Sequence, residues 1–319
     1  MVTAAPRVSV IMPARDAAAT LPETLASVRG QTVSDWEVVL VDDGSGDDTA
    51  AIARAADERV RVVRNATSVG PSRARNRALR EARGELVAVL DADDLWKPTY
   101  LESQIGAYER ALAEGRRVGA VCCDAELAGP AGSVGLWSDR VGRVEHIDLD
   151  ALLQENLVWV GVLGAREAFL DIGGWYEHPT GDAVHEDCED YDLALRLVEA
   201  GWEIVVNPEV LAVYRLGAGA RSAQIVRTAR ANELLLARAL GRDALTPAQQ
   251  RIARRRTRLF EIVRRRAGIA AEPRPLRRAA ATLALAPRGV MSVLENPQRW
   301  RHWVRHGPRS AGAERHVSS

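Results

Sequence analysis

The stretch VSVIMPARDAAATLPETLASVRGQTVSDWEVVLVDD, residues 8–43, decides the fold. Its first run, VSVIM, is short and β-branched, as in a strand. The run EVVLV at 37–41 is continuously apolar, which is typical of a strand buried on both faces. Between the two runs, Pro22 suits the first turn of a helix and Gly30 suits its end. A strand, a helix and a second strand with short connections form the repeating unit of a parallel sheet.

The same alternation continues along the chain. We expect a helix from about residue 48, a strand at 59–63, a helix at 71–82 and a fourth strand at 85–90. Further strands are expected near 119–127, 157–163, 202–206 and 210–214, with helices near 149–155, 166–171 and 189–200. Past residue 222 the pattern is helical. The sequence therefore predicts an α/β fold with a doubly wound, mixed but mainly parallel sheet and a C-terminal helical extension.

The composition is that of an ordinary globular protein. The chain has 319 residues, of which 47% are hydrophobic and 27% are charged, and this excludes collagen-like, disordered and small disulfide-stapled proteins. Only three cysteines are present, which fits a reducing compartment. No run approaches the roughly 20 apolar residues that cross a bilayer, and the N-terminus lacks the layout of a signal peptide. We therefore expect a cytoplasmic location.

The zero formal charge of the chain hides an uneven distribution. Residues 251–319 contain 17 Arg, no Lys and four acidic residues, a net charge of +13, whereas residues 1–250 carry −13. A basic segment on an acidic body indicates an anionic partner, either a lipid surface or nucleic acid. Because the body is acidic and has no recognition motif, we expect no nucleic-acid partner. We expect instead a peripheral contact of the Arg-rich tail with anionic membrane, at the inner face of the plasma membrane.

Acidic residues follow the predicted strands at the ends where ligands bind in such sheets. The loops read PARD at 13–16, DDGS at 42–45 and DADD at 91–94. Two carboxylates 4 Å apart repel each other by roughly 4 kcal/mol at an effective dielectric constant of 20. A bound cation, or hydrogen bonds to a ligand, would relieve this repulsion. The sequence therefore predicts a ligand site at this edge of the sheet.

The run Asp91-Ala92-Asp93 places two carboxylates at the end of a buried strand. Carboxylates are the ligands that Mg²⁺ and Mn²⁺ take in proteins, commonly together with substrate phosphates. The alternative is an acidic loop or a cap for the next helix. At the second strand, Asp42-Asp43 could likewise accept a hydrogen bond from a nucleobase or cap the helix that follows.

Two further segments point to a polar ligand. Gly70 opens a helix, where free N–H groups favour phosphate, and Arg73 or Arg75 could add contacts; a solvated helix face is an equally good interpretation. The acidic run 186–192 is either an ordinary helix start or the source of a general base. No G-x-S-x-G, P-loop or G-x-G-x-x-G motif occurs in the expected place, which argues against hydrolases that use a serine nucleophile, P-loop enzymes and dinucleotide oxidoreductases.

Taken together, these segments resemble the family 2 glycosyltransferases, which have the GT-A fold. The resemblance rests on VSVIMPARD, DWEVVLVDDGSGDDT, GPSRARNRALREARGELVAVLDADD, GGWYE and EDCEDYDLALRL, and it covers roughly residues 7–215. It implies a nucleotide-sugar-binding catalytic domain at 1–220 and an Arg-rich, mainly helical extension at 221–319.

The resemblance also implies roles for single residues. Pro13 and Asp16 would lie near the nucleobase, Asp43 would bind the base with Asp42 behind it, and Ser45 would shape the loop. Gly70 and Ala92 would belong to the donor site, and Arg73 would approach the diphosphate. Asp91 would touch the ribose or a metal-bound water, Asp93 would hold Mn²⁺ or Mg²⁺, and Asp190 would be the general base, positioned by Glu189. Family members often have a basic or His residue after the last strand, and Arg215 or Arg221 would take that place here.

The implied activity is inverting transfer of a sugar from a nucleoside-diphosphate sugar, with UDP as the expected nucleotide. The acceptor would be a hydroxyl group of a saccharide, a lipid-linked molecule or another compound. A nucleotidyltransferase and a non-catalytic nucleotide-sugar-binding module are the alternatives. Three tryptophans, Trp137, Trp159 and Trp175, either stack on sugar rings or fill the core.

Overall fold

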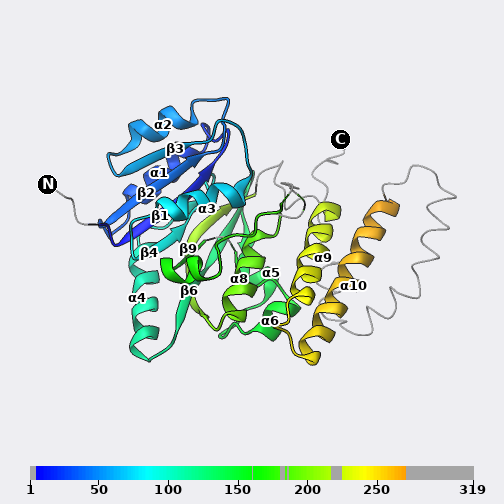
Figure 1. Cartoon of the computed structure of the whole chain (residues 1–319). Coiled ribbons are helices and arrows are strands. Elements are labelled where there is room, and N and C mark those ends of the chain that lie inside the picture. Colours follow the sequence, from blue (N-terminus) through cyan, green and yellow to red (C-terminus); the bar gives the residue numbers. More distant parts are fainter. Residues whose placement is uncertain (1–4, 160, 180–183, 185–186, 217–224, 271–319) are drawn as a thin grey trace, which may run out of the picture.

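The computed structural model describes residues 5–159, 161–179, 184, 187–216 and 225–270. Its first half alternates strands and helices as the sequence predicts (Figure 1). The elements are β1 (Val8–Ala14), α1 (Leu21–Arg29), β2 (Trp36–Asp42), α2 (Thr49–Ala56), β3 (Val60–Arg64), α3 (Pro71–Glu81) and β4 (Leu86–Val89). Every residue of β2 is buried, as expected for an apolar run with both faces covered.

The second half departs from the prediction in several places. Its elements are β5 (Leu95–Trp96), α4 (Tyr100–Ala113), β6 (Val118–Gly129), β7 (Gly132–Leu136), α5 (Trp137–Val141), α6 (Leu149–Gln154), β8 (Val162–Ala165), α7 (Arg166–Asp171), α8 (Glu189–Glu199) and β9 (Glu203–Arg215). Helix α4 and the β6–β7 hairpin were not expected. The two strands expected at 202–206 and 210–214 are one strand, β9. Its register against β6 jumps from Asn207 to Val210 because Pro208 lacks the N–H that a ladder needs.

The strands of the described residues form one nine-stranded sheet in the order β3-β2-β1-β4-β8-β6-β9-β5, with β7 paired to β6. Strands β3, β2, β1 and β4 are parallel, β8 runs antiparallel to both β4 and β6, and β6 is parallel to β9. The carboxyl ends of β1, β2 and β4 therefore meet at one edge of the sheet. This edge carries the three acidic loops that follow those strands.

Two helices follow the sheet. α9 (Ile225–Gly241) and α10 (Pro247–Ala270) pack against each other, and α10 also contacts α6 (Figure 1). Glu233 of α9 accepts a hydrogen bond from Arg264 of α10 at 2.8 Å, which links the two helices. Residues 271–319, which hold the rest of the Arg-rich tail, and Arg221 lie outside the described residues. Within the described residues, none of the helices is both long enough and apolar enough to span a bilayer.

Candidate active site

A cleft of about 1080 Å³ lies at the carboxyl ends of β1, β2 and β4. Such a volume suits a ligand of nucleotide-sugar size. Its lining includes eight of the residues named from the sequence: Pro13, Asp16, Asp43, Gly70, Arg73, Asp91, Ala92 and Asp93. Arg75, Pro179 and Arg227 also line it. The structure thus brings the PARD, DDGS and DADD loops together at one cavity.

Asp43 forms one end of this cleft. Its buried carboxylate accepts hydrogen bonds from Asn65 Nδ2 and Ser68 Oγ, both at 2.7 Å, and from the backbone N–H groups of Val69 and Gly70 at 2.9 and 3.0 Å. These donors hold the carboxylate in one orientation. The N–H of Gly70 is therefore directed to Asp43, so this group is not the free phosphate donor expected from the start of α3.

Asp42 and Ser45 are not part of the cleft lining and instead shape the loop. Asp42 Oδ1 accepts from the N–H of Ser45 at 2.9 Å, and Asp42 Oδ2 lies 3.2 Å from Arg64 Nε. The Oγ of Ser45 accepts from the N–H of Asp16 at 3.0 Å, and Asp16 Oδ1 accepts from the N–H of Gly46 at 2.8 Å. These bonds keep Asp16 at φ 49°, a conformation that costs energy for a residue other than glycine. Asp16 is thereby fixed at the cleft.

Three carboxylates gather after β4. Ligand oxygens of Asp91, Asp93 and Asp94 all lie within 4.8 Å of one another. Burial, followed by the charges of Asp93 and Asp91, raises the pKa of Asp94 well above its ordinary value. The pKa of Asp93 is also raised, by desolvation and by Asp91. Among the described residues Asp94 Oδ2 finds no hydrogen-bond partner although it is buried. An orphaned oxygen in a set of mutually repelling carboxylates fits a divalent cation.

Asp94 and Arg215 have roles that the sequence did not indicate. The backbone N–H of Arg215 donates to Asp94 Oδ1 at 2.9 Å, so the end of β9 fixes this carboxylate. The guanidinium of Arg215 is paired with Glu23 of α1 and is not part of the cleft lining. Its charge nevertheless acts on Asp93 and Asp94 and opposes the rise of their pKa values. Its expected contact with the diphosphate therefore stays a prediction. Among the described residues that follow β9, Arg227 at the start of α9 is a basic residue that lines the cleft.

Arg75 is the buried centre of the site. Its side chain is 1% exposed, and it donates hydrogen bonds to Asp91 Oδ1 at 2.7 Å and to Glu189 Oε1 at 2.8 Å. A third carboxylate, Asp190, lies 3.9 Å away. Burial acts to lower the pKa of Arg75, but Asp91, Asp190 and Glu189 outweigh it and raise that pKa. The sequence left Arg75 open between a phosphate contact and a solvated face. Its burial excludes the solvated face, and the phosphate contact stays a prediction.

Asp190 lies in the first turn of α8, next to this cation. Burial raises its pKa to about 7, against the opposing effect of Arg75. The indole Nε1 of Trp175 donates to Asp190 Oδ1 at 3.2 Å. The side chain of Asp190 is nevertheless 26% exposed, although it is not among the residues that line the cleft. A carboxyl group with a pKa near 7 is suited to act as a general base.

Two of the tryptophans are core residues. Trp159 and Trp175 are 4% and 1% exposed, so neither presents a face to a sugar. Trp175 stacks on Phe169 with ring centroids 5.6 Å apart, and Asn76 binds both its backbone N–H and its carbonyl at 2.8 Å. Trp175 instead holds Asp190 in place through its indole hydrogen bond.

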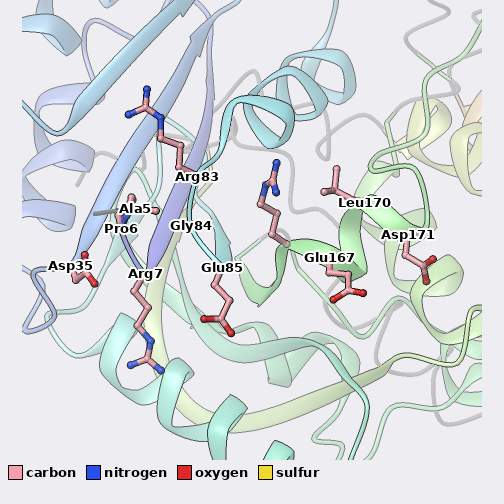
Figure 2. Close-up of a pocket in the computed structure, with 11 residues that line it drawn as sticks. Ala5, Pro6, Arg7, Asp35, Arg83, Gly84, Glu85, Glu167, Leu170 and Asp171 are labelled. Atoms are coloured by element: carbon pink, nitrogen blue, oxygen red, sulfur yellow. The ribbon is translucent and has the colours of Figure 1, made fainter. Parts of the chain in front are cut away.

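A second depression, of about 1020 Å³, lies at the opposite edge of the sheet, where Arg7 and Glu85 precede β1 and β4. Figure 2 shows that its charged side chains point in different directions and do not converge on one place. Basic and acidic residues also alternate around it. This depression therefore lacks the arrangement of a binding site, and the cleft at the carboxyl edge remains the candidate.

The chain is similar in sequence and in fold to known glycosyltransferases. Residues 9–122 match the family model described as Glycosyl transferase family 2. Over 99 residues the chain is 39% identical to the UDP-Glc:alpha-D-GlcNAc-diphosphoundecaprenol beta-1,3-glucosyltransferase WfgD of Escherichia coli, covering 31% of this chain and 39% of that protein. Over 271 residues it is 29% identical to the succinoglycan biosynthesis protein ExoO of Rhizobium meliloti (strain 1021), covering 81% and 75%.

The chain spans between 30% and 41% of the length of three relatives that it matches over about 100 residues. Among solved structures, the mannosyltransferase PcManGT from Pyrobaculum calidifontis, in complex with GDP-Man and Mn²⁺, is similar with a TM-score of 0.62 and 23% identity. That similarity covers 95% of this chain and 84% of the mannosyltransferase. Residues 9–122 thus match glycosyltransferase family 2, and the architecture of the chain is the GT-A fold.

Proposed function

We propose that this protein transfers a sugar from a nucleoside-diphosphate sugar to an acceptor hydroxyl with inversion at the anomeric carbon. The observation that carries the proposal is the position of Arg75. This buried cation joins Asp91 in the donor cleft to Glu189, the neighbour of Asp190. The expected metal end of the cleft and the expected base therefore belong to one cluster, although they lie far apart in the sequence. Residues 1–220 would form the catalytic unit.

The donor would lie along the cleft from Asp43 to Asp93. The fixed carboxylate of Asp43 would accept an N–H of the base, and Asp16 and Pro13 would lie at the same end of the cleft. Arg73, which pairs with Glu177, and Arg227, which pairs with Asp187, line the cleft and would attract the diphosphate. UDP is the proposed nucleotide, because the relative from Escherichia coli is named for UDP-Glc.

A divalent cation, Mn²⁺ or Mg²⁺, would be held by Asp93 together with Asp91 and Asp94. These carboxylates form the cluster of hard oxygen ligands described above, and Asp94 Oδ2 has no other partner among the described residues. When bound, the ion would supply positive charge to the oxygens of the departing diphosphate.

In the proposed reaction Asp190 accepts the proton of the acceptor hydroxyl, and that oxygen attacks the anomeric carbon. The bond from this carbon to the diphosphate oxygen breaks, and nucleoside diphosphate leaves. Trp175 and Glu189 are positioning residues, because Trp175 holds one oxygen of Asp190 and Glu189 fixes Arg75 beside it. A general base contributes about 10²- to 10⁴-fold to such a reaction.

The acceptor is proposed to be saccharide, lipid-linked or both, at an anionic membrane surface. Arg251, Arg254 and Arg258 are exposed on one face of α10. Each would be worth about 1 kcal/mol at an anionic bilayer. A larger fraction of the wild-type chain than of the R251Q/R254Q/R258Q variant should therefore sediment with phosphatidylglycerol vesicles. Equal sedimentation of both proteins would contradict a membrane contact through this face of α10.

A thermal-shift panel of nucleoside diphosphates and nucleotide sugars, each with and without Mn²⁺, tests the donor site. We expect one nucleotide to stabilise the protein more than the others and Mn²⁺ to enlarge its effect. A panel in which no nucleotide raises the melting temperature would contradict the proposed function.

A further inference from the structure

We propose that Arg238 of α9 is a positioning residue for the catalytic base, so that the C-terminal helices are part of the active site. This inference rests on the proposed role of Asp190. The boundary expected at residue 220 would place Arg238 in a separate extension. The contacts of Arg238 instead join α9 to both structures that hold Asp190: helix α8 and the loop around Trp175.

The first contact is with Asp192 of α8. This carboxylate is fully buried two residues after Asp190, and Arg196 of the same helix donates to it at 2.5 Å. Two cations of α9 approach its other oxygen, Arg238 at 3.5 Å and Arg242 at 3.6 Å. A buried carboxylate is stable only where cations and hydrogen bonds compensate its lost hydration. The start of α8 therefore depends on charges that α9 supplies.

The second contact is with Tyr176. The guanidinium carbon of Arg238 lies 3.9 Å from the centroid of the Tyr176 ring, in a cation–π arrangement. Tyr176 follows Trp175, whose indole donates to Asp190. One guanidinium thus restrains α8 on one side of Asp190 and the Trp175 loop on the other.

Other pairs tie α9 to α8 along its length. Arg242 binds Glu199 at 2.7 Å near the end of α8, and Asn232 Nδ2 lies 3.2 Å from the sulfur of Cys188 at its start. These contacts fix how the two helices pack. Only Arg238 also touches the Trp175 loop in the contacts described here, which makes it the side chain to test.

The test compares R238M and R238K with R230M in the full chain. Arg230 is on the same helix but is half exposed and pairs with Glu233, away from α8. Two quantities are measured: amide hydrogen exchange across the described residues, and release of nucleoside diphosphate from the donor that the thermal-shift panel selects. Methionine removes the charge and the stacking plane, whereas lysine keeps the charge.

We expect amide exchange in R238M to be at least about tenfold faster in 174–179 and 187–193 and unchanged in β1. The kcat should fall by about 10- to 100-fold with the donor KM within about twofold of wild type, because misplacement of a reacting group slows chemistry without loosening donor binding. R238K should recover part of kcat, and R230M should match wild type.

Exchange in R238M that equals that in R230M would overturn the proposal. So would exchange that is faster everywhere, β1 included, since that reports a general loss of stability. If the wild type releases no nucleoside diphosphate from any donor, the proposed function fails, and the exchange data still decide whether Arg238 positions the start of α8.

Discussion

Arg75 donates a 2.8 Å hydrogen bond to Glu189, although 114 residues separate them in the chain. The same guanidinium binds Asp91, so a single cation connects helix α3, the loop after β4 and helix α8. The proposed donor cleft and the proposed base are therefore electrostatically coupled. A substitution of Arg75 should therefore lower both the stability of the fold and the catalytic rate.

Replacing Arg75 by methionine should strongly destabilise the fold. Glu189 and Asp91 would lose their shared cation, and leaving one side of a buried ion pair uncompensated typically costs about 3–5 kcal/mol. Urea denaturation followed by circular dichroism measures this loss. R80M, on the exposed face of the same helix, should stay within about 0.5 kcal/mol of wild type. Similar midpoints for R75M and R80M would show that the cluster is not held by Arg75.

The rate of sugar transfer should depend on pH through Asp190. A general base acts only in its ionised form, and burial raises the pKa of Asp190 to about 7. The kcat/KM should therefore fall about tenfold per pH unit below 7 and level off above pH 8. Initial rates of nucleoside-diphosphate release between pH 5 and 9 measure the profile. A flat profile between pH 5 and 8 would exclude Asp190 as the base.

The same raised pKa predicts the pH dependence of stability in D190N. An acid whose pKa is higher in the folded state opposes folding once it ionises, so the wild type loses stability from about pH 4 to about pH 7. Asparagine carries no such charge. The melting temperature of D190N minus that of wild type should therefore rise between pH 5 and pH 7 and then remain constant. A difference that falls over this range would contradict the raised pKa.

Removal of one metal ligand should abolish the effect of Mn²⁺ on nucleotide binding. A ligand at one hundred times its Kd stabilises a protein by about 2.7 kcal/mol, so saturating Mn²⁺ and nucleotide should raise the melting temperature of wild type. D93N should respond to the nucleotide but gain nothing further from Mn²⁺. D48N removes an exposed carboxylate of the neighbouring loop and should behave as wild type. If Mn²⁺ raised the melting temperature of D93N as much as that of wild type, Asp93 would not be a metal ligand.

Much of the donor half of the site could be predicted from the sequence. The carboxyl ends of parallel strands meet at one edge, so PARD, DDGS and DADD had to lie close together once the strands were recognised. The strands themselves were visible because their apolar runs are continuous and their helices end at Gly30 and near Gly84. Local sequence therefore indicated where this part of the site lies.

The connections made across the chain could not be predicted in this way. Arg75 lies in a helix rich in arginine, and its burial depends on a carboxylate from α8. The pairing of Arg215 with Glu23 and the core position of Trp175 likewise depend on how distant elements pack. Asp94 was visible in DADD, and three carboxylates within four residues were the signal that it belongs with the proposed metal ligands.

The most direct test of the central claim is a ³¹P NMR time course of wild type and D190N with the selected donor, Mn²⁺ and an acceptor saccharide. We expect wild type to produce nucleoside diphosphate, and we expect D190N to bind the donor with unchanged Kd but to produce nucleoside diphosphate about 10²- to 10⁴-fold more slowly. Pyrophosphate as the product, or release by D190N at the wild-type rate, would contradict it.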